Sequence, residues 1–129
     1  MNDELLNDIG MNMKEIEELY YRVLEKVDRY SMERVHNEYN FIKQFLTSNE
    51  LPHIIEEPED AIEQYDYYLR KFYEILLEWI IITEDINVNI DIPELANDIC
   101  GGTLTFKEAI EQIKEQQIDS EILYDEILE

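Results

Sequence analysis

Residues 58–82 read PEDAIEQYDYYLRKFYEILLEWIII, and they carry the pattern on which the predicted fold is built. Its apolar residues recur at three- and four-residue steps, which is the period of one face of an α-helix. Pro58 suits the first turn of a helix, because its missing amide hydrogen would have no partner there. We therefore predict a helix from Pro58 to about Ile82, with an apolar seam broad enough for the central helix of the fold. The seam comprises Ala61, Ile62, Tyr65, Tyr68, Leu69, Phe72, Ile75, Leu76, Trp79 and Ile80, and Tyr73, Leu77 and Ile81 widen it near its end.

Residues 13–47, which precede this helix, carry the same period. Asn12 lies just before them and is a residue type that commonly caps helix N-termini. The apolar seam shifts within residues 28–33, where Ser31 could cap a second helix. We expect either one helix of about 50 Å or two helices that meet at this break. Residues 48–57 contain serine, asparagine and proline and are typical of a linker.

Residues Ile86–Ile92, which follow the central helix, alternate apolar and polar without a fault. This pattern is typical of a half-buried strand. No second strand is visible in the sequence, and a lone strand would leave its backbone groups unpaired. The segment is therefore either an extended loop packed on the core or an edge that pairs with another chain.

The C-terminal third predicts short helices. Pro93 to Cys100 reads as a helix that the glycine pair 101–102 ends. Thr105 and Glu108 form a capping box, which predicts a helix that runs to about Gln117. A last short helix could be capped by Asp119 or Ser120, with Ile122, Leu123, Ile127 and Leu128 on its apolar side.

Together these segments predict a mostly α fold: a small helical bundle with two long helices, short C-terminal helices and at most one short extended segment. The length of 129 residues fits one domain, residues 1–129, and a hydrophobic fraction of 45% is enough for a core. Cys100 is the only cysteine, so no intramolecular disulfide can form. The first residues lack the basic start and apolar stretch of a signal peptide. We expect a cytoplasmic protein, in the host cytoplasm if a phage encodes it.

Charge restricts the partners more than any motif does. The chain has 10 basic and 32 acidic residues and a formal net charge of −22, which would repel nucleic acid and anionic membrane surfaces. Residues 13–47 hold seven acids and six bases, a net of −1, whereas residues 48–129 hold 22 acids and four bases, a net of −18. If that −18 covered half of the folded surface, each charge would occupy roughly 200 Å², against about 100 Å² per phosphate on a DNA duplex.

The acids of the central helix recur at i, i+3 and i+4, as one row that only Arg70 interrupts. Like charges at this spacing destabilise a helix by a few tenths of a kcal/mol per pair. The row is either the solvated face of an acidic protein or a surface that matches cationic side chains of a partner, where tyrosine rings would add cation-π contacts. The candidate partner-binding residues are Glu56, Glu57, Glu59, Asp60, Glu63, Asp66, Tyr67, Tyr73, Glu74 and Glu78.

Patterns that would indicate catalysis or metal binding are incomplete. Glu33 and His36 have the spacing of a di-iron ligand pair, but Pro52 interrupts its counterpart at Glu50 and His53. Residues 85–96 resemble the start of a calcium loop, with isoleucine in place of its glycine and alanine in place of its bidentate glutamate. Cys100 would lie at a helix C-terminus, where the helix dipole disfavours a thiolate. We therefore expect no enzyme, no metal and no cofactor.

These observations favour a stoichiometric inhibitor that binds the basic nucleic-acid groove of a partner, such as a CRISPR effector or another nuclease, as a DNA mimic. In composition and charge layout the chain resembles phage anti-CRISPR and anti-restriction proteins, although no family motif is matched. One alternative is an immunity protein or secretion chaperone that neutralises a cognate toxin or effector. Another is a homo-oligomeric structural module in which residues 86–92 pair across a two-fold axis of a homodimer.

Overall fold

The computed structural model describes residues 3–47, 61–87 and 89–116, and it shows the predicted α-helical bundle. Residues 106–116 are also helical, and the described residues contain no β-strand. The predicted helix start at Pro58, the linker and the helix after residue 117 lie outside the described residues. The other helices are α1 (Asp3–Ile9), α2 (Met13–Lys26), α3 (Arg29–Thr47), α4 (Ala61–Thr83) and α5 (Ile92–Cys100).

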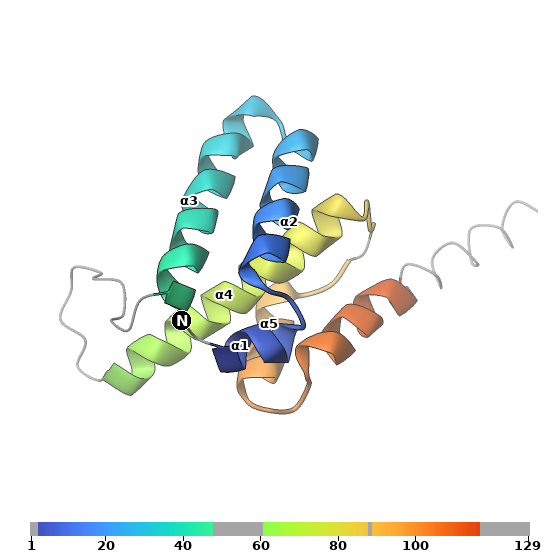
Figure 1. Ribbon diagram of the computed structural model, residues 1–129. Helices are drawn as coiled ribbons and strands as arrows, with labels where there is room; N and C mark the ends of the chain where they lie inside the picture. Colours follow the sequence, from blue (N-terminus) through green and yellow to red (C-terminus); the bar gives the residue numbers. More distant parts are fainter. Residues whose placement is uncertain (1–2, 48–60, 88, 117–129) are drawn as a thin grey trace, which may run out of the picture.

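Helix α4 is the central element, as its apolar seam predicts. The antiparallel hairpin of α2 and α3 packs on it, and α5 packs against it as well (Figure 1). The helix over 106–116 also packs against α4, through the ring contact of Phe106 with Tyr73. Because α4 contacts helices from both halves of the chain, its surface brings together residues that are far apart in the sequence.

The core is built around α4. Among its side chains, Tyr68, Phe72, Leu76, Leu77 and Trp79 are almost completely buried. Burying an apolar side chain of this size contributes about 1.5–3 kcal/mol. They pack with buried residues of the other helices, which include Ile16, Leu19, Val23, Val35, Ile42, Leu46 and Ile113.

A ring cluster joins α2, α3 and α4. Tyr20 of α2 stacks on Tyr39 of α3 with 4.3 Å between the ring centroids, and it lies 6.0 Å from the indole of Trp79. The Tyr20 hydroxyl lies 2.9 Å from Nδ1 of His36. This cluster fixes the position of the α2–α3 hairpin on α4.

Residues 13–47 form two helices, and the break between them falls at Val27 and Asp28. Val27 adopts an extended conformation, with φ −91° and ψ 158°. The Asp28 carboxylate accepts a hydrogen bond from the backbone amide of Ser31 at 2.9 Å. The expectation that Ser31 caps the second helix is therefore wrong. Asp28 lies immediately before the first residue of α3, which is the N-cap position. A side chain at the N-cap can accept from the backbone amide three residues later, which here is that of Ser31.

Residues after α4 form an extended loop rather than a strand. Ile86 is buried, whereas Asn87 and Asn89 are exposed, so the alternation predicted from the sequence is present in the burial of these side chains. No described segment lies beside them as a strand to pair with, and Asp91 instead caps α5 by accepting from the Glu94 amide at 3.1 Å. Of the two alternatives, the structure therefore shows the extended loop packed on the core, and pairing of this segment with another chain stays a prediction.

Local capping signals are confirmed. Asn12 and Glu15 form a reciprocal capping box at the start of α2. Thr105 and Glu108 form the predicted capping box at the start of the last described helix, with hydrogen bonds of 3.0 and 3.1 Å. Gly102 follows the end of α5 with a φ of +82°, a backbone conformation that favours glycine. None of the described helices combines the length and the apolarity that crossing a membrane requires.

Candidate partner-binding surface

The predicted partner-binding residues fall into three groups. Tyr73 is buried, and the acidic side chains of Asp66, Glu74 and Glu78, with the ring of Tyr67, lie on α4. The side chain of Glu63 is not described, although its backbone belongs to α4. The remaining predicted residues lie outside the described residues: Glu56, Glu57, Glu59 and Asp60.

Asp66, Glu74 and Glu78 form what we call the acidic stripe. A step of four residues advances about 40° around a helix, so the stripe winds around α4 instead of forming one flat row. Asp66 lies beside the end of α5, in a groove of about 390 Å³ that Arg70 and Cys100 also line. Glu78 lies at the other end of the stripe, beside Glu38 of α3. The acidic surface therefore extends from the α5 side of α4 to the α3 side.

Arg70 neutralises the middle of the acidic stripe. Its Nε lies 3.7 Å from Oε1 of Glu74, and its guanidinium lies 5.5 Å from the centroid of the Tyr67 ring. The Tyr67 ring is 48% exposed, as predicted, but it already contacts a cation of its own chain. Asp66 and Glu78, at the two ends, are the stripe carboxylates for which the described residues provide no ion pair.

The carboxyl of Glu78 is partly buried and lies near a second acid. Partial burial raises its pKa above the ordinary value of 4.5, and the nearby carboxylate of Glu38 raises it further. Arg34 and Lys71 oppose this shift without cancelling it. An additional positive charge close to Glu78 would favour the ionised form of its carboxyl.

Tyr73 does not lie on this surface, and the expectation that its ring is exposed is wrong. Its side chain is 5% exposed, and its ring packs against those of Phe72 and Phe106. Burial raises the pKa of its hydroxyl to about 12. The residue faces the last described helix, which covers that side of α4.

Most described carboxylates of the second half, including two of the acidic stripe, have no ion pair. Glu74, Glu84 and Asp85 are paired with Arg70, Lys114 and Lys26. The other described acids from residue 65 onward have no cationic group within 4.0 Å among the described residues. This set is Asp66, Glu78, Asp91, Glu94, Asp98, Glu108, Glu111 and Glu115.

The residues of the incomplete metal and nucleophile patterns have other roles. Nδ1 of His36 contacts the Tyr20 hydroxyl, Asp85 pairs with Lys26, and Asp91 caps α5. No three histidine, cysteine, aspartate or glutamate side chains of the described residues are grouped closely enough to hold a metal ion. Burial and then the charge of Asp66 raise the pKa of the Cys100 thiol, which stays protonated at neutral pH.

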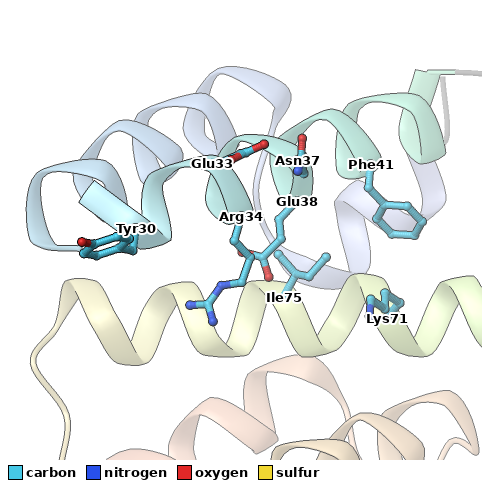
Figure 2. Close-up of a pocket in the computed structure, with 8 residues that line it drawn as sticks. All are labelled: Tyr30, Glu33, Arg34, Asn37, Glu38, Phe41, Lys71 and Ile75. Carbon is cyan, nitrogen blue, oxygen red and sulfur yellow. The ribbon is translucent and has the colours of Figure 1, made fainter. Parts of the chain in front are cut away.

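A second groove, between α3 and α4, was not anticipated from the sequence. It has a volume of about 540 Å³. Figure 2 shows Tyr30 and Phe41 toward its opposite ends, with Arg34, Glu38 and Ile75 between them. The Tyr30 side chain is 94% exposed. Residues 30, 34, 38 and 41 share one helical face, and this spacing was the signal that could have indicated the groove.

Comparison of the chain with protein-family models, with curated proteins and with solved structures found no match. We therefore infer its function from its own residues.

Proposed function

We propose that this protein is a stoichiometric inhibitor that binds the basic nucleic-acid-binding groove of another protein and excludes the nucleic acid. The observation that carries the proposal is the acidic stripe together with the unpaired carboxylates of α5 and of the helix over 106–116. A partner that binds phosphates with arginine and lysine side chains would find carboxylates in their place.

The charge balance supports a macromolecular cationic partner. The chain carries a net charge of −22, and its described residues form only three ion pairs within 4.0 Å. Such a surface costs stability through self-repulsion, and it increases the rate at which a cationic protein is encountered. At Glu78, partial burial and then the neighbouring carboxylate of Glu38 raise the pKa of the carboxyl, so this acid adds to that cost locally.

The inhibition would be competitive in mechanism. Carboxylates of the acidic stripe would pair with the arginine and lysine side chains that otherwise contact phosphate, so bound inhibitor and bound nucleic acid exclude each other. Because both interactions depend on charge, the affinity for the partner should fall as salt rises.

A charge-reversal experiment with a matched control tests this proposal. The stripe variant carries Asp66→Lys, Glu74→Lys and Glu78→Lys. The control carries Glu17→Lys, Glu18→Lys and Glu25→Lys, which make the same change in net charge at exposed positions of α2. Each protein is mixed with a basic nuclease such as a CRISPR effector, and its complex and the residual DNA binding are measured by size exclusion and by gel shift.

We expect the wild type and the control to form a complex and to displace DNA, and the stripe variant to do neither. Equal loss in both variants would mean that net charge alone drives binding, and it would overturn the stripe as the contact surface. The proposal fails if the wild-type chain neither binds basic nucleases at low salt nor reduces their binding of DNA.

A further inference from the structure

The face of α3 that borders the groove has no packing partner at its N-terminal end. Tyr30 is 94% exposed, and its ring makes no ring contact within the described part of the chain. Arg34 projects between α3 and α4 (Figure 2) without a described carboxylate within 4.0 Å, and the same holds for Lys71. The groove therefore combines an exposed ring with charges of both signs that are not paired.

Local charge indicates which partner this face suits. The groove is lined by two cations, Arg34 and Lys71, and by two anions, Glu33 and Glu38, so its lining is neutral. The groove lies beside residues 13–47, which carry a net charge of −1, whereas the whole chain carries −22. A second copy of the chain would be repelled by the acidic half, and it meets the least repulsion here.

The face is also self-complementary. If two α3 helices lie antiparallel about a two-fold axis near residue 36, Arg34 of each copy faces Glu38 of the other. The same arrangement brings Tyr30 to the opposite end of the groove, which holds Phe41 and Lys71 (Figure 2). Phe41 offers a ring contact, and Lys71 offers a cation for the tyrosine ring.

Glu38 is held in position for this contact. Its Oε1 accepts a hydrogen bond from the Trp79 indole at 3.2 Å. Because Trp79 is buried in α4, this bond restricts the orientation of the Glu38 carboxylate. The carboxylate has no ion pair with the described residues, so an arginine of a second copy could supply one. We infer that the chain forms a symmetric dimer through α3, in which Arg34 pairs with Glu38 of the other copy and Tyr30 fills the groove.

This inference is independent of the proposed inhibition. A helix of 19 residues is only about 28 Å long, so the contact is small and the dimer should depend on protein concentration. Sedimentation velocity of the full chain at increasing concentration, at about 0.15 M salt to screen the acidic halves, measures it. We expect the mass to rise from 15.6 kDa toward twice that value.

Charge reversal with rescue by mixing tests the pairing. Arg34→Glu places like charges opposite each other in the dimer, and so does Glu38→Arg. Each variant alone should dimerise about tenfold more weakly or not at all. An equimolar mixture of the two restores opposite charges at both contacts, and it should recover a dimer that contains one chain of each kind.

A second pair of variants avoids any effect on Glu38 and its indole partner. Tyr30→Ala removes the exposed ring of the groove, whereas Tyr21→Ala removes an exposed ring of α2 that lies outside it. Helical circular dichroism verifies that each variant is folded. We expect only Tyr30→Ala to weaken the dimer. A mass of 15.6 kDa at all concentrations, or a dimer insensitive to Tyr30→Ala and not recovered by mixing, overturns the inference.

Discussion

The indole of Trp79 donates a hydrogen bond to Oε1 of Glu38 at 3.2 Å, and this bond joins α4 to α3 across 41 residues of chain. Trp79 is completely buried, and it is the only tryptophan of the chain. The bond therefore links the core to the charged groove, and the fluorescence of one residue reports on both.

Removing the acceptor of this bond should destabilise the protein. Glu38→Ala leaves a buried indole N–H without its partner, which should lower the free energy of unfolding by about 1–2 kcal/mol. Glu38→Gln keeps an oxygen acceptor, so its effect should stay within about 0.5 kcal/mol. Urea denaturation followed by Trp79 fluorescence measures both. Equal effects of the two variants would show that the charge of Glu38, and not the hydrogen bond, is what matters.

Glu78 should make stability depend on pH in the acid range. Its pKa in the folded protein lies above the ordinary value of 4.5, so the folded state binds a proton more readily than the unfolded state does. Stability from this group is therefore complete below pH 4.5 and is lost as pH rises through the folded pKa. Glu78→Gln should stabilise the protein at neutral pH by up to about 0.5 kcal/mol, since the side chain is only partly buried and solvent screens its charge.

The difference between wild type and Glu78→Gln should disappear in denaturation curves recorded below pH 4.5. A constant difference at all pH values would contradict the assignment.

Tyr73 should limit stability in alkali. Its hydroxyl titrates at about 12 in the folded protein and near 10 when unfolded, so stability is lost as pH rises between these values. The loss is on the order of 2 kcal/mol over this range. Tyr73→Phe should remove it, and it should also remove the latest phase of tyrosinate absorbance in an alkaline titration. Survival of that phase in the variant would assign it to another tyrosine.

The second capping box should contribute to the C-terminal part of the fold. Thr105→Ala removes the side chain that accepts from the Glu108 amide, at a cost of about 1 kcal/mol. Thr103 lies two residues earlier and is exposed, and its side chain forms no such bond with the described residues, so Thr103→Ala is the control. Thermal unfolding followed by circular dichroism should separate the two variants.

Cys100 should react slowly with thiol reagents. Burial and the neighbouring charge of Asp66 raise the pKa of its thiol, which lowers the fraction of reactive thiolate. We expect modification by a disulfide reagent at neutral pH to be slower than that of the unfolded chain in urea. Asp66→Asn should accelerate the reaction of the folded protein. Reaction at the unfolded rate in the folded wild type would contradict the burial of this side chain.

Much of the fold could be predicted from the sequence because its signals are local. The seam of α4 and the caps at Asn12 and Thr105 depend on residues within one or two helical turns, and all three are confirmed. Asp28 and Ser31 are both good capping residues, and only the position of the helix start decides between them.

Features that depend on packing between distant segments could not be predicted from the sequence. Tyr73 widens the apolar face of α4, but its burial depends on Phe106, which lies more than thirty residues away. The α3–α4 groove likewise depends on how two separate helices approach each other. For the candidate site, the exposure of Asp66, Tyr67 and Glu78 followed from helical period, whereas the pairing of Arg70 with Glu74 had to be observed.

The central position of α4 has a consequence for biosynthesis. The α2–α3 hairpin packs on α4, and Val23 and Ile42 of the hairpin are buried in the common core. A ribosome that adds about 5–20 residues per second needs roughly 2–7 s to extend the nascent chain from Thr47 to Thr83. During that interval the emerging hairpin exposes its apolar stripe to chaperones and to neighbouring nascent chains. Synonymous codons that slow translation within α4 would prolong this exposure.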